Sequence, residues 1–357
     1  MAQGRKLRFG VIGAGGFAEI CHVPGLQSHP QAEVVALCGR RYDHARAMAD
    51  RLGVPDVHTD YRELCAREDL DGVTITTPNA VHAEQALAAF LHGKHVFCEK
   101  PLGMNVAQVR EMLAAAEASG KVHQVAFTFR YTYCIQELRR RVAAGDLGQP
   151  FYVRLRFDGW GGLRPDWQVG WREKQDLAGG GMLYDMGSHL FDTARFVLGP
   201  IATATGFTHN IPRQRVDRIT GEVTDVETDD LAAASFIHEN GVRGEWFMSR
   251  ATPPHTENAY LEVIGPEGAL QASMSRGNQE RLRLSRPTAP EWEEVALPEA
   301  AYDGQPHALG RMMRSFVEAC LRGRLDGDVD ASFEDGLAAQ QGLAAVEQAQ
   351  DGPRWVR

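Results

Sequence analysis

Short apolar runs alternate with amphipathic stretches through the first third of the chain, and this rhythm predicts strands alternating with helices. The expected strands are Leu7–Ile12, Glu33–Leu37, Gly72–Thr76, His95–Cys98 and His123–Phe127. The expected helices are Ala18–Leu26, His44–Leu52, Tyr61–Arg67, Ala80–His92 and Val106–Ser119. Alternation of this kind implies right-handed crossovers and a parallel, doubly wound sheet.

Past about residue 124 the pattern changes from alternation to strands in runs. A helix (Tyr133–Ala144), a long strand (Phe151–Phe157) and a helix (Leu183–Leu198) come first. The expected antiparallel strands that follow are Ala202–Thr208, Asp230–His238, Gly241–Ser249, Ala259–Gly265, Leu270–Ser273 and Arg281–Ser285, and the expected closing helices are Leu309–Arg322 and Phe333–Gln350. Strands in runs predict an α+β domain. We therefore expect two domains, residues 1–124 and 125–357, and the C-terminal helix can pack back on the first.

The length and composition agree with two globular domains. The chain has 357 residues, 43% of them hydrophobic and 24% charged. Its net charge of −9 argues against a nucleic-acid partner, which selects a basic face. No apolar stretch of membrane length is present, and the first strand begins too early to leave room for a signal peptide, so we expect a cytoplasmic protein. The six cysteines form no C-x-x-C pair, which predicts reduced thiols and no metal site.

A glycine-rich turn, GAGGFA at residues 13–18, joins the first expected strand to the first helix. In a dinucleotide-binding turn, Gly13 would allow the tight turn, Gly15 would let backbone N–H groups approach a pyrophosphate, and Ala18 would allow close helix–strand packing. Gly16 and Phe17 complete this loop. A glycine-rich turn can also be a simple connection. Its position between a strand and a helix favours dinucleotide binding.

The residues after the second strand bear on the choice of dinucleotide. An NAD site usually has an acidic residue here for the ribose 2′-hydroxyl, but this chain has Gly39, Arg40 and Arg41 and no carboxylate before Asp43. Gly39 would clear space, and either arginine can pair with a 2′-phosphate. This favours NADP over NAD. The alternative is that both arginines are solvated and Asp43 caps the next helix.

The fifth strand ends in Glu99-Lys100-Pro101. A surface turn would supply water to both charges. In a doubly wound sheet, however, the carboxyl ends of the strands line the ligand crevice, which would place both charges beside a bound nicotinamide. A lysine there can donate a proton to a substrate oxygen. Pro101 would fix the chain, and a cis bond before it would aim the lysine.

A second group of chemical residues lies in GGGMLYDMGSHLFD at 179–192. Asp185 and His189 stand four apart on an expected helix and so share a face. Histidine exchanges protons near neutral pH, and a carboxylate one turn away can orient it or hold substrate. The alternative is a structural histidine and an acidic residue of the first helical turn. The three glycines favour the functional reading, because they let backbone pass close to a ligand.

These motifs together resemble the family of glucose-fructose oxidoreductase and inositol 2-dehydrogenase, often named Gfo/Idh/MocA. The resemblance covers essentially the whole chain and rests on GAGGFA at 13–18, TTPNAVH at 76–82, CEKP at 98–101, GGGMLYDMGSH at 179–189 and the tail at 332–350. It implies a Rossmann domain followed by an α+β domain with a large open, mostly antiparallel sheet. It also implies NAD(P)-dependent oxidation or reduction at a carbon of a sugar, sugar derivative or cyclitol. In that reaction Lys100 would be the catalytic lysine, Asp185 a substrate-contacting carboxylate and His189 the general acid/base.

The resemblance assigns further residues. Those expected to line the cofactor are Thr77, Pro78, Asn79, His82 and Glu99, of which His82 can be purely structural. By their place in the chain and their chemistry, Arg130, Tyr131, Trp160, Trp167, Trp171 and Arg172 are also expected near the substrate, although core packing is the alternative for each tryptophan. A homodimer or homotetramer is expected, with its interface on the strands in 230–249 and 259–273.

The resemblance leaves three other functions open. One is a glycoside hydrolase that uses a transient NAD redox step and much the same side chains. Another is a regulator of the same fold that senses dinucleotide without catalysis; retention of Lys100, Asp185 and His189 argues against it. The third is reduction of a substrate other than a sugar, such as a diol or a tetrapyrrole.

Overall fold

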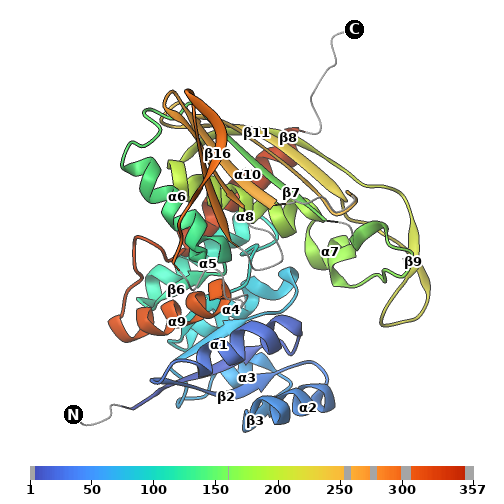
Figure 1. Ribbon diagram of the computed structural model, residues 1–357. Helices are drawn as coiled ribbons and strands as arrows, with labels where there is room; N and C mark the ends of the chain where they lie inside the picture. The colour runs from blue at the N-terminus through green and yellow to red at the C-terminus, as the bar shows by residue number, and fades with distance from the viewer. Residues whose placement is uncertain (1–4, 160, 253–258, 274–279, 299–306, 350–357) are drawn as a thin grey trace. The chain divides into compact units, whose positions relative to one another are not determined.

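The computed structural model describes residues 5–159, 161–252, 259–273, 280–298 and 307–349. The chain forms two compact units (Figure 1). The first consists of residues 1–128 and 308–340, and the second of residues 129–307 and 341–357.

A six-stranded parallel sheet is the centre of the first unit. Its strands lie in the order β3-β2-β1-β4-β5-β6, so the first strand and the fourth are neighbours in the middle. The strands are β1 (Leu7–Ile12), β2 (Ala32–Cys38), β3 (Asp56–His58), β4 (Gly72–Ile75), β5 (His95–Cys98) and β6 (His123–Val125). This order confirms the predicted doubly wound sheet. Strand β3 was not predicted, because three residues at an edge are too few to show a pattern.

Helices cover both faces of this sheet, as the continuous burial of its strands requires. On one face, the ring of Phe316 from α9 (His307–Arg322) lies 5.7 Å from that of Phe9 and 5.3 Å from that of Phe97. The other face packs on side chains from α3, α4 and α5 and on Phe333 from the start of α10. The helices are α1 (Val23–Gln27), α2 (Tyr42–Leu52), α3 (Tyr61–Cys65), α4 (His82–Leu91), α5 (Val106–Ser119) and α10 (Phe333–Ala349).

Helix α5 shows how local chemistry sets an element's bounds. Asn105 precedes it, and its side chain accepts a hydrogen bond of 3.0 Å from the backbone of Gln108. Gly120 follows it with a φ of 63°, the left-handed conformation that ends many helices. The predicted bounds, Val106–Ser119, are confirmed.

Two expected helices begin differently from the prediction. Where one helix was expected over Ala18–Leu26, a π-helical turn, Ala18–His22, leads into α1. Where one was expected over Leu183–Leu198, a second π-helical turn, Leu183–Gly187, leads into α8 (Ser188–Leu198). A π turn is set by hydrogen bonds one residue longer than those of an α-helix, and it leaves no mark in the apolar pattern.

An eight-stranded sheet is the centre of the second unit, with its strands in the order β16-β15-β14-β13-β7-β12-β11-β8. Every neighbouring pair is antiparallel except β7 and β12, which run parallel. The strands are β7 (Tyr152–Asp158), β8 (Ile201–His209), β11 (Leu231–His238), β12 (Arg243–Ser249), β13 (Ala259–Gly265), β14 (Gly268–Ser273), β15 (Arg281–Arg286) and β16 (Ala289–Val295). The predicted large, mostly antiparallel sheet is confirmed. Strand β16 was not predicted, because charged residues of an edge strand interrupt the apolar alternation that marks a strand.

In the described part of the chain, helices cover one face of this sheet, which explains the alternation along its strands. In β7, Val153, Leu155 and Phe157 are buried while the residues between them are half-exposed. The buried face packs on α6 (Tyr133–Ala143), on α8 and on Leu343 and Val346 of α10. The core of the second unit therefore lies between the sheet and these helices.

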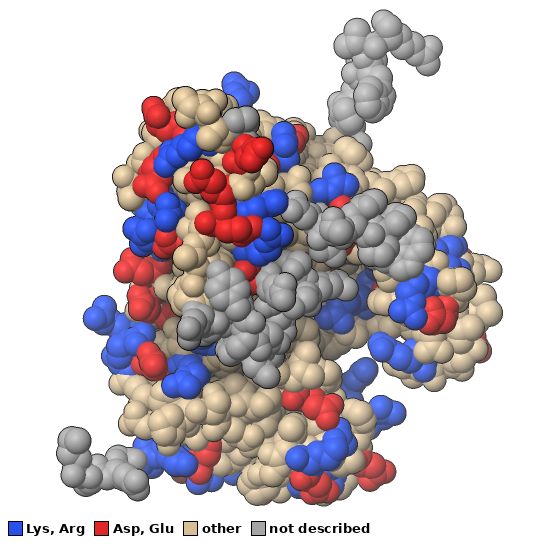
Figure 2. Space-filling view, in the orientation of Figure 1, with Lys and Arg blue, Asp and Glu red and all other residues tan. Residues whose placement is uncertain are grey.

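A small lobe projects from the second unit (Figure 1). It contains α7 (Gln175–Ala178) and a separate two-stranded sheet of β9 (Gln214–Val216) and β10 (Val223–Asp225). None of these elements was predicted, since a two-stranded hairpin of three-residue strands is too short to set a pattern. Acidic and basic side chains are interspersed over the visible face of the molecule (Figure 2).

Candidate functional site

Contacts with neighbouring strands fix the start of the glycine loop, and its middle, Gly15 and Gly16, is exposed to solvent. Gly13 has a φ of 112°, and a Cβ at this position would lie 2.6 Å from Oγ1 of Thr76. Its N–H donates to the carbonyl of Cys38, at 2.8 Å. By contrast, a Cβ on Gly15 or Gly16 would meet nothing within 4 Å. Gly13 is thus required by the fold, while Gly15 and Gly16 leave bare backbone facing open space, which fits a pyrophosphate.

The other two loop positions differ in burial. Ala18 is fully buried at the start of the π turn, as close packing of this turn requires. Phe17 is half-buried.

Gly39 has a structural reason for being small. A Cβ on it would lie 2.8 Å from the Cβ of Ala14 in the glycine loop and 3.1 Å from that of Ala45 in α2. Arg40 and Arg41 are exposed, and neither side chain pairs with another residue in the described part of the chain. The guanidinium groups of Arg40 and Arg41 are therefore available to a ligand.

The start of α2 does not support the alternative in which Asp43 caps this helix. No side chain caps the helix, and Asp43 is exposed in its first turn. One contact was not anticipated: Nε2 of His44 lies 3.0 Å from the carbonyl oxygen of Ala14. A histidine in a first helical turn gives no signal of this in the sequence.

The loop after β4 is tied to the glycine loop and to α4. Thr76 donates from its hydroxyl to the carbonyl of Gly13, at 3.1 Å, and Thr77 donates to the side chain of Gln85, at 2.7 Å. Pro78 is half-buried and Asn79 is buried.

His82 joins this loop to the residues after β5. Its ring is fully buried, with Nε2 2.9 Å from the carbonyl oxygen of Thr77 and Nδ1 3.0 Å from that of Pro101. Burial lowers the pKa of His82, and its hydrogen bonds to the backbone oppose that effect. These contacts give His82 a structural part in holding the two loops together.

The carboxyl end of β5 carries a buried carboxylate beside a half-buried ammonium. Glu99 is buried, and its Oε1 lies 3.0 Å from Nε2 of His22. Lys100 is half-buried, and the bond from Lys100 to Pro101 is cis. His22 was not among the expected residues. Its position four residues after Ala18, in the same helical stretch, is the only sequence signal that points to it.

Asp185 and His189 lie at the junction of the second π turn and α8. The carboxylate of Asp185 is 38% exposed and accessible to a ligand. His189 is buried, and its ring centroid lies 4.8 Å from that of Phe129. Tyr184, by contrast, is buried on the core side.

Arg172, in the segment before α7, lies near Asp185. Its Nε lies 3.8 Å from Oδ1 of Asp185, and its guanidinium stacks 4.3 Å from the centroid of Trp171. Trp167 is partly exposed and donates from its indole N–H to Glu173, at 3.3 Å. Trp160 lies outside the described residues. A cation, a carboxylate and an aromatic face thus gather beside the helix that carries His189.

Arg130 and Tyr131 are more enclosed than expected for substrate contacts. Nε and Nη2 of Arg130 donate to the two carboxylate oxygens of Asp192, at 2.9 and 2.6 Å, and both side chains are buried. Tyr131 is 2% exposed. This ion pair engages the guanidinium of Arg130 inside the second unit, and its contact with substrate stays a prediction.

The segment 227–230, Glu-Thr-Asp-Asp, anchors the loop of Arg172 and the helical stretch that carries Asp185. Thr228 donates to the carbonyl of Arg172, at 2.9 Å. Asp229 accepts from the backbone N–H groups of Gly181, at 2.6 Å, and Leu183, at 2.9 Å. One short segment therefore holds the loop of Arg172 and the start of the helical stretch of Asp185.

A buried ionic network holds this segment in turn. Arg213 pairs with both carboxylate oxygens of Asp230. Arg250 donates to Asp230, at 2.7 Å, and to Glu173, at 3.2 Å. The side chains of Asp230 and Glu173 are 0% and 3% exposed, so their charges depend on these partners.

The three glycines before Asp185 are explained by contacts within the chain. A Cβ on Gly181 would lie 2.0 Å from the carbonyl oxygen of Asp229, and one on Gly180 would lie 2.5 Å from the ring of Tyr184. Gly179 ends α7 with a φ of 78°. The expectation that these glycines make room for a ligand is not needed to account for them.

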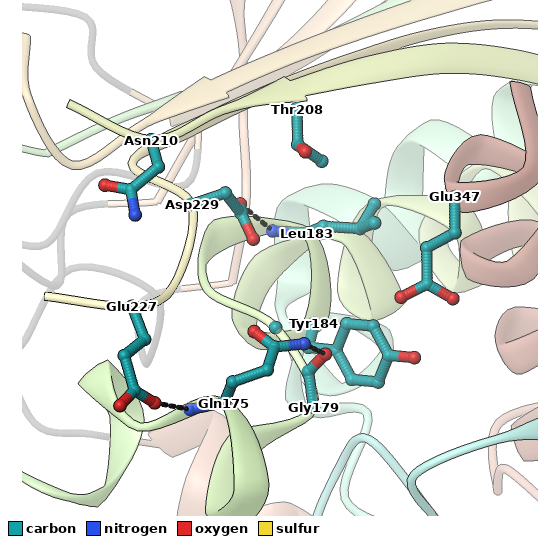
Figure 3. A pocket seen from close by; sticks show the side chains of 10 residues that line it. Gln175, Gly179, Leu183, Tyr184, Thr208, Asn210, Glu227, Asp229 and Glu347 are labelled. Atoms are coloured by element: carbon teal, nitrogen blue, oxygen red, sulfur yellow. Dashed lines mark hydrogen bonds between the residues drawn. The ribbon is translucent and has the colours of Figure 1, made fainter. Parts of the chain in front are cut away.

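A pocket of about 180 Å³ lies in the second unit beside this segment (Figure 3). Its lining residues are Gln175, Gly179, Gly180, Leu183, Tyr184, Thr208, Asn210, Glu227, Asp229 and Glu347. Burial raises the pKa of Glu347; a hydrogen bond with Tyr184 opposes this and the charge of Asp229 adds to it. Neither Asp185 nor His189 is among the lining residues.

Within the described ranges, no three His, Cys, Asp or Glu side chains are grouped so as to bind a metal ion. Nor does that part of the chain contain a helix with the length and apolar character needed to span a membrane.

The doubly wound sheet with its open glycine loop, followed by a one-sided mixed sheet, defines the class of dinucleotide-binding oxidoreductases. Residues 7–127 match the family described as "Oxidoreductase family, NAD-binding Rossmann fold", and residues 135–271 match the GFO/IDH/MocA C-terminal domain. The chain belongs to this Gfo/Idh/MocA family of oxidoreductases.

Individual relatives agree with this placement. D-glucoside 3-dehydrogenase of Escherichia coli is 34% identical over 66% of this chain and 68% of its own length. 1,5-anhydro-D-fructose reductase of Ensifer adhaerens is 29% identical over 97% of both chains. The crystal structure of an oxidoreductase domain protein from Kribbella flavida superposes with a TM-score of 0.87, at 29% identity and 97% coverage of both chains.

Proposed function

We propose that this protein transfers a hydride between a nicotinamide dinucleotide and a hydroxyl-bearing carbon of a sugar, sugar derivative or cyclitol. The observation that carries the proposal is the open backbone at Gly15 and Gly16. It lies at the edge of the sheet where β5 ends in the half-buried Lys100. The relatives named for a glucoside and an anhydrofructose support a sugar as substrate.

We assign the proton chemistry to three side chains. In the oxidation, His189 takes the proton of the substrate hydroxyl, Lys100 polarises the same oxygen, and Asp185 holds a neighbouring hydroxyl. A bound nicotinamide would supply the acceptor for the hydride. Reduction returns the proton from His189 to the oxygen. The partial exposure of Asp185 supports its role, because a side chain that holds a substrate hydroxyl must be reachable by the substrate.

We assign binding roles to the flanking residues. In the glycine loop, the open backbone of Gly15 and Gly16 holds the pyrophosphate, Gly13 and Ala18 shape the turn, and Phe17 completes it. Thr77, Pro78, Asn79 and Glu99 lie toward the nicotinamide. Trp167, Trp171 and Arg172 bind substrate, since aromatic faces suit the C–H face of a sugar ring and Arg172 can read a hydroxyl or carboxylate. The pairing of Arg172 with Asp185 supports this assignment.

We propose NADP as the preferred cofactor. Arg40 and Arg41 follow β2, are exposed and have no partner in the described part of the chain, so both are available to a 2′-phosphate. The first experiment is titration of the purified protein with NADPH and with NADH, following nicotinamide fluorescence. Tighter binding of NADPH supports the arginine assignment, tighter binding of NADH overturns it, and binding of neither overturns the enzyme proposal.

A panel of glucosides, anhydro sugars and inositols then tests the reaction. Net reduction of added NADP by one of these substrates supports the dehydrogenase. Release of a free sugar from a glycoside without net reduction of added cofactor would indicate the hydrolase, and binding without any turnover would indicate a regulator.

We further propose a homodimer or homotetramer that pairs through the open face of the large sheet. That face carries half-exposed apolar residues of the central strands, Ile237, Phe247 and Tyr260, and the exposed Phe207 near its edge. Sedimentation measurements on the protein and on a Phe247→Glu variant test this, because a charge at the interface would dissociate the oligomer.

A further inference from the structure

His22 is a fully buried histidine that no part of the proposed reaction uses. It is the last residue of the π turn that leads from the glycine loop into α1. Its ring packs edge-on against Phe97 of β5, with centroids 5.3 Å apart and an interplanar angle of 78°. The imidazole is thereby fixed in orientation, with Nε2 at 3.0 Å from the carboxylate of Glu99.

The surroundings of the two ring nitrogens determine the proton's position. Nδ1 is buried and has no hydrogen-bond partner among the residues the structure describes, whereas Nε2 faces a carboxylate. A second proton on Nδ1 would be a buried donor without an acceptor, which is costly. The geometry therefore favours a neutral His22 that donates from Nε2 to Glu99 and leaves Glu99 ionised.

One carboxylate oxygen of Glu99 is held by this bond, while the other has only a long contact. Its Oε2 lies 3.4 Å from the backbone N–H of Lys100, which is at most a weak contact, and its side chain is 11% exposed. The negative charge is also felt by the neighbouring thiols. Burial first, and the charge of Glu99 second, raise the pKa of Cys21 and of Cys98. Glu99 thus retains acceptor capacity for a ligand.

We infer that His22 is a positioning residue that fixes the carboxylate of Glu99 as acceptor for the amide N–H groups at the nicotinamide end of the dinucleotide. The inference rests on the proposed function, since it presupposes a bound nicotinamide. A carboxylate that rotates freely must be ordered when the ligand binds, and this costs binding free energy. A buried donor that already holds the carboxylate reduces that cost. The glycine loop and the nicotinamide end are then linked through one π turn.

The experiment separates the nicotinamide end from the rest of the cofactor. Affinities for NADPH and for 2′-phospho-ADP-ribose, which lacks the nicotinamide, are measured by calorimetry for the wild type, His22→Leu and His22→Gln. We expect His22→Leu to weaken NADPH about tenfold and 2′-phospho-ADP-ribose less than about twofold. His22→Gln, which keeps an N–H donor near the position of Nε2, should restore most of the NADPH affinity.

Other outcomes overturn the inference in recognisable ways. Equal weakening of both ligands by His22→Leu would mean that His22 only supports the glycine loop. No weakening of either would mean that it is inert packing. If the wild type binds neither ligand, the proposed function fails as well, and this result is distinct from the other two.

Two further measurements apply if His22→Leu does not fold. A Glu99→Gln variant should weaken NADPH more than 2′-phospho-ADP-ribose, because it removes the charge of the acceptor that His22 positions; equal weakening of the two ligands would contradict the inference. In the wild type, nitrogen-15 NMR should show His22 neutral with its proton on Nε2, and this resonance should shift with NADPH but not with 2′-phospho-ADP-ribose. A proton on Nδ1 or equal shifts with both ligands would contradict the inference.

Discussion

The two regions that carry the expected catalytic residues are held in different ways. Around Lys100, short backbone and side-chain hydrogen bonds link loops that each follow a strand of one parallel sheet. Around Asp185, the loop of Arg172 and the helical start are held by segment 227–230, and that segment depends on Arg213 and Arg250. The first region is built from neighbouring strand ends, and the second from charges that lie far apart in the sequence. Substitutions can test this contrast.

The largest effect on stability is expected from breaking the ionic network. Replacing Arg250 with Met leaves Glu173 and Asp230 with fewer partners in a buried setting, and we expect a loss of about 3 kcal/mol in the free energy of unfolding. All six tryptophans lie beyond residue 128 and none lies between 308 and 340, so tryptophan fluorescence in urea reports on the second unit.

The matched control is Arg154→Met. Arg154 pairs with Glu245 across the sheet, with 43% and 45% of the two side chains exposed. Such a pair contributes about 0–1 kcal/mol. Equal losses in the free energy of unfolding would show that the network around Arg250 contributes no more to stability than a surface ion pair.

Lys100→Met tests the first region by its chemistry. Loss of a group that polarises the reacting oxygen should lower kcat by about a thousandfold, while NADPH affinity stays within about threefold. Steady-state kinetics and cofactor titration measure both quantities. Lys121→Met, a half-buried lysine of the same unit, is the control. A wild-type kcat in Lys100→Met would remove the lysine from the proposed mechanism.

Two glycine substitutions compare the regions directly. Gly181→Ala places a Cβ 2.0 Å from the carbonyl oxygen of Asp229, so it should cost about 2 kcal/mol or more of stability. Gly15→Ala meets nothing within 4 Å, so it should leave the unfolding midpoint unchanged and weaken NADPH about tenfold by obstructing the pyrophosphate. Thermal unfolding and fluorescence titration of both variants give the answer. A Gly15→Ala protein that binds NADPH normally would count against the glycine loop as the cofactor site.

The smallest effect concerns pH. Burial first, with Lys121 second, lowers the pKa of His95 to about 4, and Nδ1 of His95 accepts a hydrogen bond of 3.0 Å from the backbone of Val122. A histidine whose pKa is lower in the folded state binds fewer protons there. Its contribution to stability is therefore complete above the unfolded pKa, near 6.5, and declines as the pH falls below it.

The expected loss for the first unit between pH 7 and 5 is about 2 kcal/mol from His95. His95→Asn keeps an acceptor for Val122 but cannot titrate, so it should flatten this dependence. Hydrogen exchange of the amides of β5 and β6 measures the change. An unchanged slope in the variant would assign the pH dependence to other histidines of the first unit whose pKa is lowered by burial, such as His82 and His123.

The sequence by itself determined the features that depend on short stretches of chain. Apolar runs placed most strands of the two large sheets, because burial on one or both faces sets a pattern that residue type reveals. Asn105 and Gly120 set the ends of α5, and the motifs that named the family are likewise contiguous.

The tertiary structure decided what depends on distant residues. It paired His22 with Glu99, held Arg172 near Asp185 through segment 227–230, and enclosed Arg130 with Asp192. It also showed that Gly181 is small because the backbone of Asp229 approaches it, and that two helices begin with a π turn. Such contacts arise from packing between elements far apart in the chain, where the residue types alone admit many partners.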